Sequence, residues 1–65
     1  MKVYVETRDF KKKVLFKGKT VGQLIKELGL SSENFVLSKN GEIVLEDEKL
    51  ADGDKVKLFP VISGG

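Results

Sequence analysis

The spacing of hydrophobic residues divides the chain into several strands and one helix. Apolar and polar side chains alternate over residues 1–7, where Val3 and Val5 share one face. A period of two predicts a strand with one buried face. Residues 13–17 carry the run Val-Leu-Phe between two lysines and predict a second strand, while the largely polar residues 8–12 predict a turn. The two strands are therefore expected to form a β-hairpin.

A helix is predicted after this hairpin. Thr20 can act as its N-cap, and Gln23, three residues later, completes the pattern of a capping box. Gly29 stands where a left-handed C-cap is favoured. The apolar residues between these signals recur at helical spacing, so the helix over residues 20–28 should pack one face against the sheet. That face consists of Val21, Leu24, Ile25 and Leu28.

A second hairpin is predicted in the following segment. Residues 35–39 indicate a third strand, and residues 42–45 indicate the strand that returns from it. Asn40-Gly41 between them is the strongest short hairpin signal, because a type I′ turn needs a positive φ at both central positions.

The last third of the chain predicts one more strand. Residues 46–50 are polar apart from Leu50, and one helical turn is expected there. Residues 52–54, Asp-Gly-Asp, are typical of a turn, which explains the two carboxylates better than an acid/base pair does. Residues 55–59 alternate as a final strand, and Pro60 ends regular pairing because it has no N–H.

The order of these elements is ββαβββ, which is the order of the β-grasp, or ubiquitin-like, fold. We therefore expect an α+β domain with a mixed sheet of four to five strands and one helix packed across one face. The domain is expected to span residues 1–61, and residues 62–65 are expected to form a flexible tail that ends in Gly-Gly. The expected core consists of Val3, Val5, Val14, Phe16, Val21, Leu24, Ile25, Leu28, Val56 and Leu58.

The composition narrows the chemistry that the chain can perform. Its 65 residues include no cysteine and no histidine. This excludes a disulfide framework, a thiolate nucleophile, a cysteine-based zinc site and the usual general base. We expect no catalytic residue and no metal site, so the protein is not expected to be an enzyme.

Charge and hydropathy bear on location and partners. The net charge is +2, and Arg8 is the single arginine among 12 basic residues, which argues against recognition of nucleic acid. No apolar run approaches the ~20 residues of a membrane span, and the N-terminus has no signal-peptide pattern. We expect a cytoplasmic protein without a membrane partner.

Two charged clusters could serve as contact sites. Residues 11–13 are three lysines, for which a solvated loop is the expected state and nucleic-acid contact the alternative. Glu42 and the acidic residues 46–48 are expected to form a solvated face, with contact to a basic partner or a divalent cation as the alternatives.

The C-terminal segment resembles that of the ThiS/MoaD family of sulfur-carrier proteins, with the ThiS branch nearest. The similarity lies in the Asp-Gly-Asp turn at residues 52–54, the last strand, and then Phe59, Pro60, an apolar pair, a small residue and a terminal Gly-Gly. Residues 20–24 and the Asn-Gly turn add to it. The apolar pair, small residue and glycines are Val61, Ile62, Ser63, Gly64 and Gly65.

This resemblance implies a chemistry centred on the terminal carboxylate. An E1-like adenylyltransferase of the ThiF/MoeB type would consume ATP to adenylate Gly65. A sulfur donor such as a cysteine desulfurase would then convert it to a thiocarboxylate, with no bound cofactor. Gly64 and Ser63 would let the tail thread through a narrow channel, since glycine has no Cβ. The acceptor would be a thiazole synthase, the molybdopterin synthase large subunit or a tRNA thiolation enzyme.

A patch of exposed apolar residues is expected to bind these enzymes. Phe59 and Tyr4 should share the open face of the sheet if the first and last strands are neighbours, and Pro60, Val61 and Ile62 should extend the patch toward the tail. Exposed aromatic side chains rimmed by charge are typical of partner sites. The alternative is that Phe59 and Ile62 close the edge of the core.

Two other functions remain open from the sequence. The activated carboxylate could be captured by a lysine amine, which would make the chain a ubiquitin-like protein modifier. The domain could also be a plain binding module in which the Gly-Gly end has no role.

Overall fold

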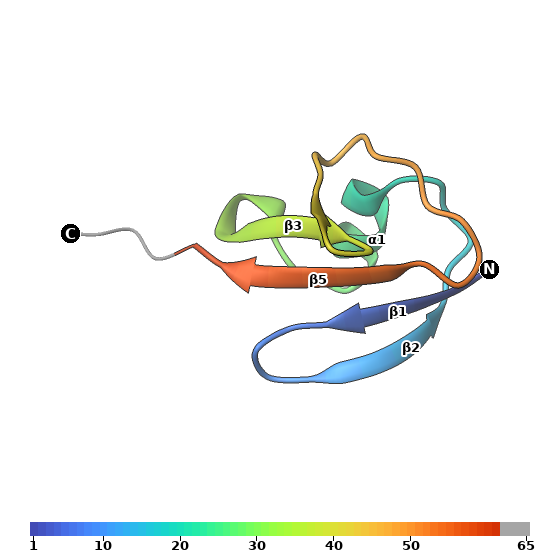
Figure 1. Cartoon of the computed structure of the whole chain (residues 1–65), viewed down its shortest axis with the longest axis horizontal. Helices are drawn as coiled ribbons and strands as arrows, with labels where there is room; N and C mark the ends of the chain where they lie inside the picture. Colours follow the sequence, from blue (N-terminus) through green and yellow to red (C-terminus); the bar gives the residue numbers. More distant parts are fainter. Residues whose placement is uncertain (62–65) are drawn as a thin grey trace.

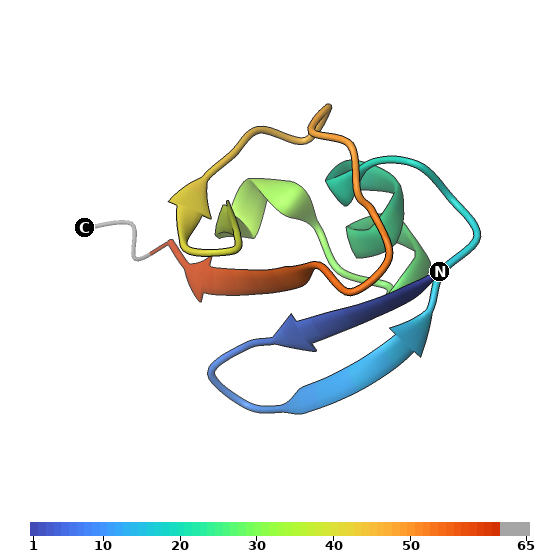
Figure 2. The ribbon, with the colours of Figure 1, turned by 45° about the vertical axis from the view of Figure 1, so that its right-hand side comes forward.

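The computed structural model describes residues 1–61, which form one five-stranded mixed sheet with a single helix on one side (Figures 1 and 2). The strand order is β2-β1-β5-β3-β4. The elements, in chain order, are β1 (Lys2–Glu6), β2 (Lys11–Leu15), α1 (Val21–Glu27), the 3-10 helix η1 (Ser32–Asn34), β3 (Phe35–Lys39), β4 (Glu42–Ile43) and β5 (Lys55–Pro60).

The last strand lies at the centre of the sheet. Strand β5 runs parallel to β1 and antiparallel to β3, with Val5 opposite Val56 and Leu37 opposite Leu58. These four residues point toward the helix and are buried. The predicted β-grasp arrangement, with neighbouring first and last strands, is thereby confirmed.

The helix begins and ends where the sequence predicts. The Thr20 side chain accepts a hydrogen bond from the Gln23 backbone N–H at 3.3 Å, and the Gln23 side chain accepts one from the Thr20 N–H, also at 3.3 Å. Gly29 follows the helix with φ of +78°. The capping box and the left-handed glycine therefore bound α1 on both sides.

The predicted Asn-Gly turn is confirmed as well. Asn40 has φ of 52° and Gly41 has φ of 88°, so both central positions of the turn are left-handed. The Asn40 side chain also accepts a hydrogen bond from the Lys55 N–H at 3.0 Å. The tip of the β3–β4 hairpin is thereby fixed to the start of β5.

The first turn closes earlier than expected. The Thr7 side chain accepts hydrogen bonds from the N–H groups of Asp9 and Phe10, and the Thr7 N–H donates to the Phe10 carbonyl at 2.7 Å. These bonds complete the turn at Phe10. Strand β2 therefore occupies Lys11–Leu15, two residues before the predicted 13–17.

The segment after β4 also differs from the prediction. Strand β4 ends at Ile43, and residues 46–50 contain a turn at 46–47 and a single bridge from Lys49 to Thr20 in place of the expected helical turn. The Glu46 and Glu48 carbonyls instead accept hydrogen bonds from the Gly22 and Val21 N–H groups, both at 2.9 Å. The chain leaves the sheet early because it supplies acceptors for the free N–H groups of the first helical turn.

The core contains most of the residues expected in it. Eight of the ten predicted residues are buried, while Val14 and Leu28 are only partly buried against them. Leu37 and Leu50 complete the core and were not predicted. Among residues 1–61, no helix combines the length and the hydrophobicity that a membrane span requires.

Candidate functional site

The face of the sheet opposite α1 carries the predicted contact residues. Burial alternates along β1 and β5, so Val3, Val5, Val56 and Leu58 face the helix. Tyr4 and Phe59 therefore point to the other face, where they are 43% and 46% exposed. Both aromatic residues share the open face, as predicted.

Tyr4 and Phe59 nevertheless belong to separate patches. Tyr4 lies opposite Lys55, and Phe59 lies four residues further along β5, about 13 Å away along the strand. Between them, the Lys57 ammonium lies 3.7 Å from the Glu6 carboxylate. An exposed ion pair thus interrupts the apolar surface that the sequence suggested.

Phe59 has an apolar neighbour on the other side of β5. It lies opposite Val36 of β3, which is also exposed, and Ile43 of β4 lies opposite the next outward residue of β3, Ser38. Directly opposed residues of antiparallel strands point to the same face. Phe59, Val36 and Ile43 therefore form an exposed band across three strands, which we call the apolar strip.

The position of Phe59 excludes the alternative that it closes the core. Its side chain is outside the buried cluster and on the face away from the helix. Pro60 ends β5 opposite Phe35, and the Val61 N–H donates to the Asn34 carbonyl at 2.9 Å. The predicted site residues Ile62, Ser63, Gly64 and Gly65 lie outside the described residues.

Tyr4 is surrounded by lysine side chains. Its cross-strand partners are Lys13 on β2 and Lys55 on β5. Lys12 lies opposite Val5, which faces the helix, and its ammonium lies 5.4 Å from the centre of the Phe10 ring. Four lysines surround Tyr4 on the open face, and we call this region the basic half. They are Lys11, Lys13, Lys55 and Lys57.

The two carboxylates of the Asp-Gly-Asp segment stabilise turns, as expected. Asp52 accepts a hydrogen bond from the Lys2 N–H at 2.6 Å. Asp54 accepts hydrogen bonds from the Asn40 side-chain amide and the Ala51 N–H, and these bonds lower the pKa of its carboxyl group. Within residues 1–61, no three acidic, cysteine or histidine side chains gather closely enough to hold a metal ion.

The apolar strip could be predicted only in part from the sequence. Val36 belongs to a strand that was predicted correctly, but its face depends on the register with β5. Ile43 follows the Asn-Gly turn by two residues, and that spacing places it opposite Ser38. The Asn-Gly turn was the sequence signal that could have placed Ile43 opposite Ser38. The strand order that brings Ile43 toward Phe59 could be known only from the fold.

The strand order and the single α-helix on one face define the class of fold: the chain has the ubiquitin-like β-grasp fold. Its sequence matches the ThiS family over residues 1–65, and the chain belongs to that family. The resemblance drawn from the C-terminal segment is thereby confirmed.

Two solved structures share this fold over their whole length and that of this chain. The crystal structure of SAMP1 from Haloferax volcanii is 23% identical, with a TM-score of 0.76 and 100% of each chain covered. A chain of the complex of subunits 1 and 2 of molybdopterin-converting factor from Helicobacter pylori 26695 is 20% identical, with a TM-score of 0.68 and 100% of each chain covered.

Proposed function

We propose that this protein is a sulfur carrier whose Gly65 carboxylate, as the terminus of the mature chain, is converted to a thiocarboxylate. The observation that carries the proposal is the match to the ThiS family over the whole chain, which includes Gly64 and Gly65. The composition supports it, because a chain without cysteine or histidine offers a terminal carboxylate more readily than a catalytic side chain.

The proposed chemistry proceeds in two substitutions. A Gly65 carboxylate oxygen attacks the α-phosphorus of ATP on a partner adenylyltransferase of the ThiF/MoeB type, forming an acyl adenylate and releasing pyrophosphate. A thiol reduces the persulfide of a donor such as a cysteine desulfurase and releases hydrosulfide. The hydrosulfide then attacks the acyl carbon and forms a C–S bond, while the C–O bond to AMP breaks and AMP leaves with that oxygen. The carrier is a substrate in both steps, not an enzyme.

Sulfur then passes to an acceptor enzyme in the cytoplasm. The candidates are a thiazole synthase for thiamine, the molybdopterin synthase large subunit and a tRNA thiolation enzyme. In each case Ser63 and Gly64 would thread toward the acceptor's active site, and the globular domain would supply most of the binding energy.

Mass spectrometry of the intact protein tests the carrier chemistry. After incubation with ATP, a sulfide source and the adenylyltransferase of the same organism, we expect a mass gain equal to replacing one oxygen by sulfur. Deletion of Gly65 should abolish the gain. Attachment of the chain to lysines of other proteins would instead indicate a protein modifier, and an unchanged mass would support the plain binding module.

Phe59 is the residue of the apolar strip closest to the tail, and its truncation tests the partner surface. We expect Phe59→Ala to weaken binding to the adenylyltransferase about tenfold, the scale of an interface residue that costs more than 1 kcal/mol. The melting temperature should change little because the ring is half exposed. Tyr4→Ala, on the same face beyond the ion pair, is the matched control; equal effects of the two changes would contradict a site centred on Phe59.

A further inference from the structure

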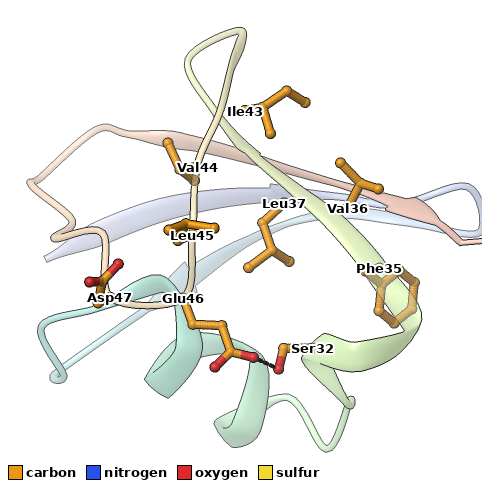
Figure 3. A pocket seen from close by; sticks show the side chains of 9 residues that line it. All are labelled: Ser32, Phe35, Val36, Leu37, Ile43, Val44, Leu45, Glu46 and Asp47. Carbon is orange, nitrogen blue, oxygen red and sulfur yellow. Dashed lines mark hydrogen bonds between the residues drawn. The ribbon is translucent and has the colours of Figure 1, made fainter.

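The free edge of the sheet at β4 borders an apolar groove (Figure 3). The groove has a volume of about 550 Å³ and lies between β3 and the segment that follows β4. One end is closed by a hydrogen bond from the Ser32 hydroxyl to the Glu46 carboxylate, drawn in Figure 3. Its apolar lining consists of Phe35, Val36, Leu37, Ile43, Val44 and Leu45.

The aliphatic side chains at the rim of this groove are unusually exposed. Ile43 is 70% exposed and Leu45 is 75% exposed, and Val36 lies beside them in the same lining. Three large aliphatic residues that face solvent around one hollow are typical of a contact site.

The backbone of β4 offers hydrogen-bonding groups at this rim. Among residues 1–61, strand β4 is the last in the sheet order, so it pairs with β3 on one side only. The Val44 N–H donates to the Leu37 carbonyl, toward β3. Because successive N–H groups of a strand alternate in direction, the Ile43 N–H points away from β3 and toward the free edge.

The charge around the groove is negative. Glu42, Glu46 and Asp47 are exposed beside Ile43 and Leu45. The nearby Lys39 does not offset them, since its ammonium lies 2.6 Å from Glu48 and donates to the Lys49 carbonyl.

This negative charge is part of a separation of basic and acidic residues along the whole sequence. Residues 1–26 carry eight basic and two acidic side chains, whereas residues 27–54 carry eight acidic and two basic ones. The basic half of the open face lies on β2 and β5. Four of the eight acidic residues, Glu42, Glu46, Asp47 and Glu48, lie in β4 and the segment that follows it. A net charge of +2 conceals this arrangement. A ligand of the edge groove should therefore be cationic.

We propose that the β4 edge binds an extended, basic segment of a partner protein, which pairs with Ile43 as an added strand. Its apolar side chains occupy the groove beside Ile43 and Leu45, and its lysine or arginine side chains meet Glu42 and Asp47. Strand addition supplies backbone hydrogen bonds, while alternate side chains supply specificity. This site shares Val36 and Ile43 with the apolar strip, but strand addition at Ile43 needs neither residues 62–65 nor the sulfur chemistry.

A peptide titration followed by NMR tests the site. The ¹⁵N-labelled full chain is titrated with a capped eight-residue peptide of alternating valine and lysine. We expect amide shift changes at residues 42–47 and slower hydrogen exchange of the Ile43 N–H. A peptide of alternating valine and glutamate should bind at least about tenfold more weakly, since its charges oppose the acidic rim. Equal binding of both peptides, or shifts confined to the basic half, would overturn the proposal.

Substitutions separate the contribution of the Ile43 backbone N–H to peptide binding from the contributions of the apolar and acidic side chains. Ile43→Pro removes the outward N–H and should weaken binding of the lysine peptide at least about tenfold, whereas Ile43→Ala keeps the N–H and should weaken it less. Asp47→Lys should also weaken binding and leaves the backbone intact. Leu15→Ala is the control, because Leu15 is 74% exposed on the opposite edge strand.

Three results would count against the site. Binding that is unaffected by Asp47→Lys and Ile43→Pro would overturn it, as would equal loss in Leu15→Ala. Shift changes at residues 42–47 that depend on protein concentration without peptide would show that a second copy of the chain occupies the edge instead.

Discussion

Asp54 joins two turns that are distant in the sequence. One carboxylate oxygen accepts a hydrogen bond from the Asn40 side chain at 3.0 Å, and the other accepts one from the Ala51 N–H at 2.8 Å. Asn40 in turn accepts from the Lys55 N–H. A single carboxylate therefore links the β3–β4 hairpin to the turn before β5, and its ionised form makes these bonds strongest.

Replacement of Asp54 by Asn should reduce stability in a pH-dependent manner. Because folding lowers the pKa of Asp54, its contribution is present above the unfolded pKa of about 3.9 and is lost as the pH falls through the folded pKa. We expect Asp54→Asn to reduce the free energy of unfolding by about 1 kcal/mol at neutral pH, the scale of one hydrogen bond. Urea unfolding between about pH 7 and pH 3 should show the two proteins converging; a constant difference would contradict this role.

Glycine is required at position 18 because the Phe16 ring approaches it closely, and not because of its backbone conformation. A Cβ built at this position would lie 2.5 Å from Cζ of Phe16, and the Phe16 ring is buried in the core. We expect Gly18→Ala to displace this ring and to cost about 1–3 kcal/mol, the usual range for overpacking. Thermal unfolding measures the loss, and Lys17→Ala, at an exposed neighbouring site, should have little effect.

Helix α1 shows how an element can be specified locally and still depend on a distant segment. Its seven residues are too few for an isolated helix to be stable in water. The capping box satisfies N–H groups from within the local sequence, whereas the carbonyls of Glu46 and Glu48 satisfy those of Gly22 and Val21. Gly22 permits this contact, since an added Cβ would lie 3.1 Å from the Glu46 Cβ.

The N-cap at Thr20 can be tested separately from the carbonyls of Glu46 and Glu48. Thr20→Ala removes the side-chain acceptor for the Gln23 N–H, and we expect a loss of about 1 kcal/mol. Thr20→Ser keeps a hydroxyl and should retain most of the stability. Chemical unfolding followed by far-UV circular dichroism provides the comparison, and equal losses in the two variants would show that the cap is not the cause.

The molecule as a whole is organised around β5. This strand pairs with both β1 and β3, so it connects the N-terminal hairpin to the C-terminal one. Its inward residues Val56 and Leu58 lie in the core, and its outward residue Phe59 belongs to the apolar strip. The same strand therefore supports the fold and carries the proposed partner surface to its end at Pro60.

Truncation of Leu58 should affect the whole domain. A buried leucine replaced by alanine costs about 2–5 kcal/mol, and a chain of this size has a total stability of about 3–10 kcal/mol. We expect Leu58→Ala to lower the melting temperature by at least about 8 °C, since 1 kcal/mol corresponds to about 4–8 °C in a domain of this size. Calorimetry measures this, with Leu45→Ala at an exposed position as the control; similar melting temperatures for the two variants would contradict the central role of β5.

The sequence by itself determined the features that depend on near neighbours. The capping box at Thr20, the left-handed residues Asn40 and Gly41, and the alternation of β5 were all predicted at the residues where they occur. Each is decided by side chains within a few positions, through local hydrogen bonds, steric limits on φ or a period of two. The family resemblance was likewise contained in the order of residues from 52 to 65.

Only the tertiary structure decided the features that depend on distant partners. Strand β4 ends at Ile43 because the next residues cap the helix, and Leu37 and Leu50 are buried because the sheet and loop close over them. The division of the open face also depends on strand order, which places the Glu6–Lys57 pair between Tyr4 and Phe59. Pairings between segments tens of residues apart leave no periodic signal in the chain. The sequence therefore indicated Phe59, but Val36 and Ile43 beside it and the β4 edge could be recognised only in the folded protein.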